Sequence, residues 1–414
     1  VIRELINAKI NIEHSDRYGW SAVFFAIKED HLDTVKLLAN NGANLNKIDN
    51  TGCTPLIYAA RDGKFSICEF LLEHGCDYRY SDELGWTALF FAGWKDQAEV
   101  IRLLVKHGAP IEQTDESGNT ALIYAARDGS CQSIIALSEA GINLNRCDKI
   151  GWSPLFFAVL KTQAEAVKTL INCGANLECY DIYGWSPLHY AARNNNLEMV
   201  TLLIELGANL EHCDEYGRSP LSIAALYNRQ ESLDILIASG ANIEHLDDYG
   251  MSALDTAEDK FFHDTVLCLV RAGASMSKRN ADCGKTLIWA TSAGKIEAIE
   301  LLLNAGANVD YCNKSYWTPL MYAIRAGHIE IVKILLDHGA NLEDFDEYGW
   351  SPLIFAAWYN QPQILELLIT HGANLEHTEQ HRRSALLIAA ERGNLEPAKI
   401  LLTYNANLNL RDDE

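Results

Sequence analysis

The sequence predicts an all-α repeat solenoid, on three observations. Glycines recur every 33 residues without a gap, at Gly19, Gly52, Gly85, Gly118, Gly151, Gly184, Gly217 and Gly250. A second glycine series with the same period runs from Gly42 to Gly372. Where the first series ends, leucines keep the frame, at Leu254, Leu287, Leu320, Leu353 and Leu386. Independent series with one period predict a single continuous array without a separate domain.

The segment from 181 to 213 shows how one unit is expected to fold. Ser186 can cap a helix N-terminus, and Pro187 suits the first helical position because no amide donor is needed there. A second helix from Leu197 to Leu206 has apolar residues at helical spacing. Gly207 ends it, since glycine takes the left-handed conformation freely. The extended residues that follow, with the next D-x-x-G turn, predict a β-hairpin.

These features resemble the ankyrin repeat, whose signature is a 33-residue period and a T-P-L-H-x-A-like first helix. The segment S-P-L-H-Y-A-A at 186–192 is the closest match, and T-P-L-I-Y-A-A at 54–60 is similar. The resemblance covers the whole chain and implies a curved array of helix-turn-helix units, each with a β-hairpin finger. It implies a partial repeat at 1–15, twelve repeats over 16–411 and the start of another at 412–414. The expected units begin at residues 16, 49, 82, 115, 148, 181, 214, 247, 280, 313, 346 and 379.

Several units depart from this motif. Three carry phenylalanine where the family usually has histidine: Phe24, Phe90 and Phe156. This replacement predicts a more apolar core seam. In the ninth unit the turn glycine shifts to Gly284 and the proline is missing, while Tyr316 and Arg382 replace turn glycines elsewhere. We expect distorted turns or a bend at the last two positions, and the weakest part of the array around residues 255–290.

The composition excludes several classes of partner. The formal net charge is −22, whereas nucleic acid or an anionic membrane surface requires a basic protein face. No apolar run approaches the ~18 residues of a membrane-spanning helix, so direct membrane insertion is not expected. The eleven cysteines include no C-x-x-C pair, and some share repeat positions. We therefore predict free thiols and an intracellular, cytoplasmic location.

The sequence has none of the motifs that mark an active site. There is no G-x-x-x-x-G-K-[ST] loop, no H-E-x-x-H and no G-x-S-x-G. Most histidines share repeat positions, as His212 and His245 do, so stacking spreads them along the surface. A zinc site would instead need four converging ligands. We predict no enzyme activity, no catalytic residue, no cofactor and no metal site.

Tryptophans gather directly after the turn glycine, a position that in the ankyrin family lies on the concave binding face. The expected groove-lining residues are Trp20, Trp86, Trp152, Trp185, Trp317 and Trp350, with Trp94, Trp358 and Tyr359 at the ends of first helices. Only Trp289 is expected in the core. Aromatic side chains give large contact area at small entropic cost, which favours a binding surface. The alternative is that each tryptophan covers the turn of its neighbour and stiffens the stack.

A row of cations accompanies these tryptophans in the first six units. Its members are Lys28, Arg61, Lys95, Arg127, Lys161 and Arg193. One interpretation is a surface for acidic side chains of a partner. The other is that the cations pair with the turn acids Asp16, Asp49, Asp82, Asp115, Asp148 and Asp181, or stack on the tryptophans.

The function that the sequence predicts is a protein-interaction scaffold whose groove binds an extended or disordered partner segment. One alternative is a structural spacer or spring, which would have no ligand in its groove. Another is the targeting arm of a larger enzyme or channel, because neither end carries the polar capping unit that a solenoid needs. The identity of the partner and the oligomeric state are left open.

Overall fold

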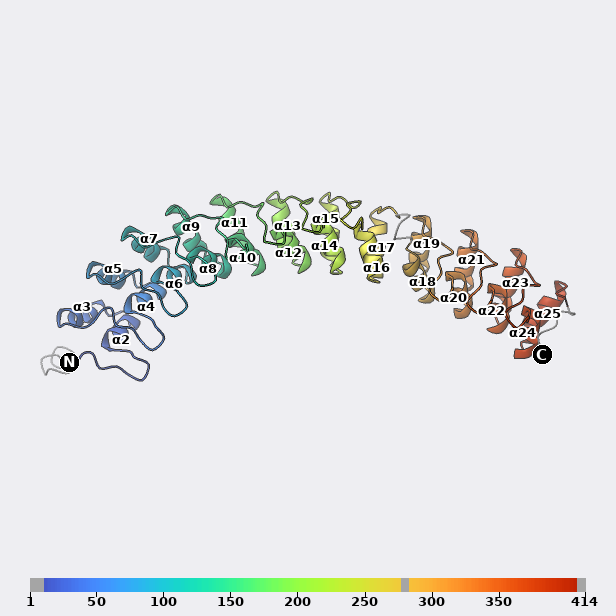
Figure 1. Cartoon of the computed structure of the whole chain (residues 1–414), viewed down its shortest axis with the longest axis horizontal. Helices are drawn as coiled ribbons and strands as arrows, with labels where there is room; N and C mark the ends of the chain where they lie inside the picture. The colour runs from blue at the N-terminus through green and yellow to red at the C-terminus, as the bar shows by residue number, and fades with distance from the viewer. Residues whose placement is uncertain (1–10, 277–282, 408–414) are drawn as a thin grey trace. The chain divides into compact units, whose positions relative to one another are not determined.

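The computed structural model describes residues 11–276 and 283–407, and these contain 24 helices in twelve pairs. They form two compact units, residues 1–215 and 216–414, each with six helix pairs. Figure 1 labels the helices along the chain. The all-α repeat fold is as predicted. The predicted partial repeat lies mostly outside the described residues, and residues 412–414 lie wholly outside them.

The first compact unit contains α2 (Ala22–Lys28), α3 (Leu32–Asn40), α4 (Pro55–Arg61), α5 (Phe65–Glu73), α6 (Ala88–Trp94), α7 (Ala98–Lys106), α8 (Ala121–Asp128), α9 (Cys131–Glu139), α10 (Pro154–Leu160), α11 (Ala164–Asn172), α12 (Pro187–Arg193) and α13 (Leu197–Glu205). The second contains α14 (Pro220–Leu226), α15 (Gln230–Ala238), α16 (Ala253–Asp259), α17 (His263–Arg271), α18 (Gly284–Ser292), α19 (Ile296–Asn304), α20 (Pro319–Ala326), α21 (Ile329–Asp337), α22 (Pro352–Trp358), α23 (Pro362–Thr370), α24 (Ala385–Arg392) and α25 (Leu395–Thr403).

Each pair follows from local sequence signals. At α4, the Thr54 hydroxyl accepts a hydrogen bond from the amide of Ile57, and Pro55 occupies the first turn. At α12, Ser186 forms a capping box with His189, a role that the sequence assigned to the serine alone. The second helix α13 then runs over the predicted span and ends before Gly207, whose φ is +92°.

Within each compact unit, the core lies between the two helices of each pair and between successive pairs. The phenylalanines of the predicted core seam, Phe24, Phe90 and Phe156, are at most 1% exposed. Adjacent alanines such as Ala191 and Ala192 are buried as well, and their small size lets the second helix approach.

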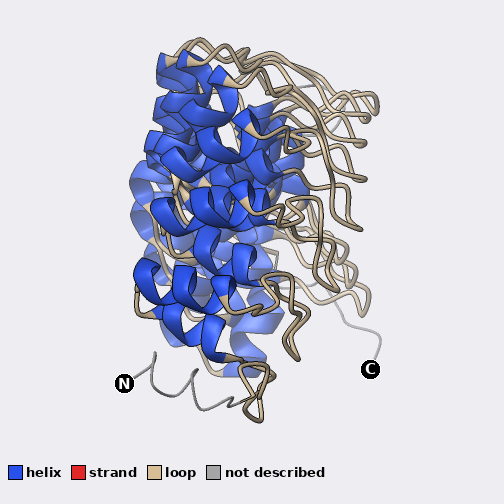
Figure 2. Cartoon of the chain, turned by 90° about the vertical axis from the view of Figure 1, so that its left-hand side faces the viewer, coloured by secondary structure: helices blue, strands red, loops and turns tan. Residues whose placement is uncertain are grey.

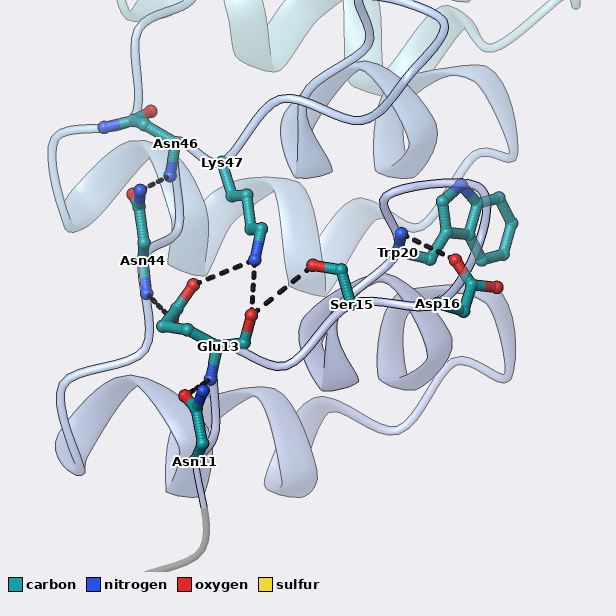
Figure 3. Close-up of polar contacts among 8 residues, drawn as sticks. All are labelled: Asn11, Glu13, Ser15, Asp16, Trp20, Asn44, Asn46 and Lys47. Carbon is teal, nitrogen blue, oxygen red and sulfur yellow. Dashed lines mark hydrogen bonds and ion pairs between the residues drawn. The ribbon is translucent and has the colours of Figure 1, made fainter.

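The predicted β-hairpins are turns. The described residues contain no strand, only two isolated bridges, Ser81 with Thr87 and Thr378 with Ser384; Figure 2 accordingly shows helices and loops. The reason is visible at Asp16, whose Oδ1 accepts the amides of Tyr18 and Trp20, each at 2.9 Å. The aspartate thus takes hydrogen-bond donors that a longer strand ladder would need (Figure 3).

A side-chain ladder joins each loop to the next one. Glu13 Oε1 accepts the amide of Asn44 at 2.8 Å, and Lys47 Nζ donates to the Glu13 carbonyl at 2.6 Å (Figure 3). The same bond from an acceptor side chain to the amide 31 residues on recurs in both compact units, at Glu112–Asn143, Glu178–Asn209, Glu244–Ser275, Glu343–Asn374 and Glu376–Asn407. It satisfies one loop amide in each of these repeats.

The turns without glycine are not distorted, contrary to expectation. Tyr316 and Arg382 have φ of 61° and 62°, within the left-handed region that the glycines occupy. Their amides keep the turn hydrogen bond, Tyr316 to Asn313 at 2.9 Å and Arg382 to Glu379 at 2.8 Å. Cys283 takes the third such position, with φ of 48°. The turn is therefore held by its hydrogen bonds, at a strain cost of ~1–2 kcal/mol per non-glycine residue.

Candidate functional site

In each compact unit, the candidate site is the surface formed by the residues after each turn glycine and the C-terminal ends of the first helices; we call it the turn face of that unit. Of its tryptophans, Trp20, Trp86, Trp152, Trp317 and Trp350 are half-buried. Trp185 is 9% exposed and packs against His189 and Tyr190. Trp185 is therefore more buried than the other tryptophans of the turn face, and its predicted role in partner binding stays a prediction.

Three of these tryptophans bond to the next repeat. The indole N–H donates to an aspartate Oδ2 located 29 residues further on: Trp20 to Asp49 at 3.0 Å, Trp152 to Asp181 at 3.4 Å and Trp185 to Asp214 at 3.1 Å. This contact supports the alternative interpretation for these three residues, since the ring braces the neighbouring turn.

A tyrosine completes the brace in alternate repeats of the first compact unit. The hydroxyl donates to the turn aspartate Oδ2, from Tyr58 to Asp49 at 2.8 Å, Tyr124 to Asp115 at 2.6 Å and Tyr190 to Asp181 at 2.6 Å. Between them stand phenylalanines at the same position, Phe25, Phe91 and Phe157. This pairing was not predicted from the sequence, although an Asp and a Tyr nine residues apart recur in every second repeat of the first compact unit.

The brace is a network of charged hydrogen bonds. Burial by itself would raise the pKa of Asp49, but hydrogen bonds from the Cys53 amide, Thr51 and Tyr58 outweigh it and lower that pKa. Burial, followed by the bond to Asp115, raises the pKa of Tyr124 to about 12. Asp49 therefore stays ionised and Tyr124 stays neutral at physiological pH.

The aromatic residues at the ends of the first helices are placed differently. Trp94 and Trp358 are half-buried, and each carries a cation on its ring: Lys95 Nζ lies 3.7 Å from the Trp94 centroid, and Arg392 lies 3.8 Å from that of Trp358. Tyr359 stacks parallel to Phe355 with 6.1 Å between centroids. Trp289, predicted in the core, is half-buried because it stacks on His263 and under Lys295.

The predicted cations lie mainly on aromatic rings. Lys28 and Arg193 stack on Trp20 and Trp185 at 5.8 and 5.7 Å. Arg61 and Arg127 stack on Tyr58 and Tyr124 at 4.6 and 4.7 Å, and pair with the adjacent Asp62 and Asp128 instead of the turn acids. Lys161 is exposed. Such stacking holds each positive head at the edge of a ring on the turn face.

Equivalent histidines make equivalent structural bonds. His212, His245 and His377 each donate from Nε2 to the carbonyl of the preceding turn glycine, at 2.9, 2.7 and 2.8 Å. In the described part of the chain, no three His, Cys, Asp or Glu side chains gather in a way that could hold a metal ion. No helix over the described ranges has the length and apolarity to cross a membrane.

The irregular eighth and ninth units contain a buried acid that the sequence did not reveal. Glu258, at the end of α16, is 2% exposed. It accepts the amides of Lys285 and Thr286 at 2.9 and 3.2 Å and the Thr286 hydroxyl. Because Cys283 supplies no side-chain cap to α18, Glu258 caps that helix from the preceding repeat.

Comparison with known proteins matches almost the whole chain to one family. The family model described as "Ankyrin repeats (3 copies)" matches residues 1–82, 79–148, 132–214, 155–247, 254–346, 287–379 and 343–412. No curated protein matches the chain. Among solved structures, the crystal structure of the human ASB11 ankyrin repeat domain is 26% identical, with a TM-score of 0.47 over 52% of this chain and 98% of that one.

Proposed function

The chain belongs to the ankyrin-repeat family, generally a family of protein-interaction modules, and we propose that its turn face binds an extended or disordered segment of a protein partner. The observation that carries this is the row of half-buried aromatic rings edged by cations. Because repeats of 33 residues stack on one another, equivalent residues form a row within each compact unit, and a row of contact residues suits an extended ligand.

The proposed aromatic contact residues fall into three groups. Trp94, Trp358 and Tyr359 lie at first-helix ends, and no hydrogen bond from their side chains to another described residue braces the next repeat. Trp20, Trp152 and Trp185 have their indole N–H engaged and can offer only ring faces. Trp86, Trp317 and Trp350 pack on Tyr124, Phe355 and Trp358. The first group is therefore the better target for an experiment on binding.

The cation row supports acidic side chains in the partner of the first compact unit. Lys28, Lys95 and Lys161 are exposed, and the stacked Arg61, Arg127 and Arg193 are half-buried. Substitution of Lys95 and Lys161 by glutamate should weaken the binding of an acidic partner segment and reduce the salt dependence of its association rate.

The test is a comparison of partners captured by the intact chain and by the variants Trp94→Ala and Trp358→Ala. Loss of a hot-spot aromatic should weaken a captured partner by ~2 kcal/mol or more, about 30-fold. Leu395→Ala, on α25 and away from the turn face, is the control. Retention of the same partners at the same affinity by both tryptophan variants would refute the proposal.

A structural spacer is the second candidate, favoured by the indole bonds from Trp20, Trp152 and Trp185 into the next repeat. It predicts that tryptophan substitutions lower stability and leave partner affinity unchanged. Measuring both quantities on Trp152→Ala separates the two functions, because a brace and a contact surface differ in which quantity moves.

A further inference from the structure

An open cavity of about 430 Å³ lies on the turn face of the second compact unit. Its walls are rings from α22 and from the turns before α20 and α22. Trp317 lies 4.8 Å from Phe355, Trp350 lies 5.4 Å from Phe355, and Trp350 lies 4.8 Å from Trp358, between ring centroids. Its volume falls within the roughly 300–1,000 Å³ of small-ligand sites.

Asp346, in the wall of this cavity, has an unfilled oxygen. Asp346 is 4% exposed, and its Oδ1 accepts hydrogen bonds from the amides of Tyr348 and Trp350, each at 2.9 Å. No group of the described residues donates to Oδ2. This oxygen is not sealed in the protein interior, since Asp346 lines the cavity and has no fully enclosed, unbonded atom.

The lack of a donor to Asp346 Oδ2 follows from the residue that stands at position 355. In the first compact unit a tyrosine hydroxyl fills this place on Asp49, Asp115 and Asp181. The eleventh unit has Phe355 at the tyrosine position. Asp346 therefore keeps its burial but receives no hydroxyl donor at Oδ2, and this oxygen, open to the cavity, can accept a hydrogen bond from a ligand.

The charges around the cavity favour a cation. Asp346 and Glu347 line it, and Arg325 is the one basic residue in its wall. Arg325 stacks on Trp317 at 5.6 Å, so this ring already holds a guanidinium on one face. Aromatic faces attract ammonium and guanidinium groups, most strongly at tryptophan. The chain's net charge of −22 steers cations toward the protein as a whole.

We propose that this cavity binds a lysine or arginine side chain of the partner segment, with the charged group donating to Asp346 Oδ2 between the rings of Trp317 and Trp350. It takes the position that a tyrosine hydroxyl has in the first compact unit. This inference rests on the proposed function, because it names the chemistry of a residue in the bound segment.

The test uses small probes and one conservative variant. Acetyl-arginine amide and acetyl-lysine amide are titrated into the full chain, and binding is followed by ¹⁹F spectra of fluorotryptophan at Trp317 and Trp350. The neutral acetyl-citrulline amide and the acidic acetyl-glutamate amide are the ligand controls. Phe355→Tyr should supply a hydroxyl to Asp346 Oδ2 and lower the affinity of the two cationic probes about tenfold or more.

The matched control is Phe157→Tyr, the same substitution at the equivalent position of α10. It should leave the response at Trp317 and Trp350 unchanged. Equal binding of citrulline and arginine probes, or unchanged binding by Phe355→Tyr, would overturn the inference. A failure here with partner capture still dependent on Trp94 refutes only the cavity, whereas capture independent of Trp94 and Trp358 refutes the proposed function.

Discussion

Asp181 and Asp346 occupy the same place in two repeats and differ in one neighbour. Both accept two turn amides at 2.9 Å, and they are 7% and 4% exposed. Asp181 also receives the Tyr190 hydroxyl and the Trp152 indole, whereas Asp346 faces Phe355. The Oδ2 of Asp181 is thus filled by two donors, whereas the Oδ2 of Asp346 has no donor among the described residues. The turn bonds of the two aspartates are the same, so the difference lies in side chains and not in the backbone.

The largest expected effect comes from removing the filled carboxylate. Asp181→Ala leaves the Tyr190 hydroxyl and two turn amides without their acceptor, so we expect the first compact unit to lose about 3 kcal/mol of stability. Asp346→Ala loses only the turn bonds and should cost about half as much. Hydrogen exchange of the amides of α12 and α22 measures both; equal losses would show that the tyrosine bond adds nothing.

Exchanging the two ring types should partly interconvert the sites. Tyr190→Phe leaves Asp181 with its weaker 3.4 Å indole bond, so we expect a loss of about 1–2 kcal/mol. Phe355→Tyr should raise the stability around α22 by about 1 kcal/mol. Urea unfolding of the two variants measures whether the first substitution lowers stability and the second raises it. A shift of stability in the same direction for both would contradict the proposed difference between the two sites.

Turn conformation offers a smaller contrast between the regions. In the first compact unit, the six turns that precede the first helices all have glycine at the left-handed position, whereas three of the six equivalent turns in the second have Cys283, Tyr316 and Arg382 there. Tyr316→Gly relieves strain of ~1–2 kcal/mol but adds ~0.5–1 kcal/mol of chain entropy, so we expect a gain of about 0.5 kcal/mol. Gly250→Ala, where an added Cβ meets no atom within 4 Å, should instead cost about 1 kcal/mol. Thermal unfolding distinguishes the two signs.

The smallest expected effect is an opposite dependence on pH. Burial raises the pKa of Glu258, although hydrogen bonds from Thr286 and Lys285 act in the opposite direction. The contribution of Glu258 to folding stability is therefore full below pH 4.5 and is lost as pH rises through the raised pKa. Burial of Asp115 is outweighed by its hydrogen bonds with Tyr124 and Asn119, which lower its pKa. The contribution of Asp115 to folding stability is therefore present above pH 3.8 and is lost as pH falls through the lowered pKa.

Hydrogen exchange at α18 and α8, corrected for the intrinsic pH effect, tests these signs. On acidification from neutral pH, α18 should gain protection before α8 loses any. Glu258→Gln should abolish the gain at α18, since the group no longer titrates. Parallel behaviour of the two helices would contradict the assignment.

The repeated frame could be predicted because its signals are local. Ser186, Pro187 and Gly207 each act within a few residues of their own position, and the helices of that unit lie where these residues indicate. The β-hairpins could not be excluded from the pattern alone, because the same D-x-x-G residues are compatible with a ladder until the aspartate is seen to bind both amides.

The candidate site was predicted only in part, because its bonds span a repeat. The position of the tryptophans on one face follows from the period, but an indole reaching a carboxylate 29 residues away does not. Burial of Trp185 depends on His189 and Tyr190 beside it, and the openness at Asp346 depends on Phe355. Both depend on which side chains lie beside one residue in one repeat, and the motif shared by all repeats does not contain that information.

The alternation of tyrosine and phenylalanine sets the step by which this region can change length through gene duplication or loss. Deleting residues 49–81 would set Trp20 opposite Asp82 and Phe91, where no hydroxyl meets the carboxylate. Deleting 49–114 would set Trp20 opposite Asp115 and Tyr124 and restore the brace. A purified chain with the longer deletion should therefore unfold at a higher temperature than one with the shorter deletion. The inheritable building block of this region is a tandem of two repeats.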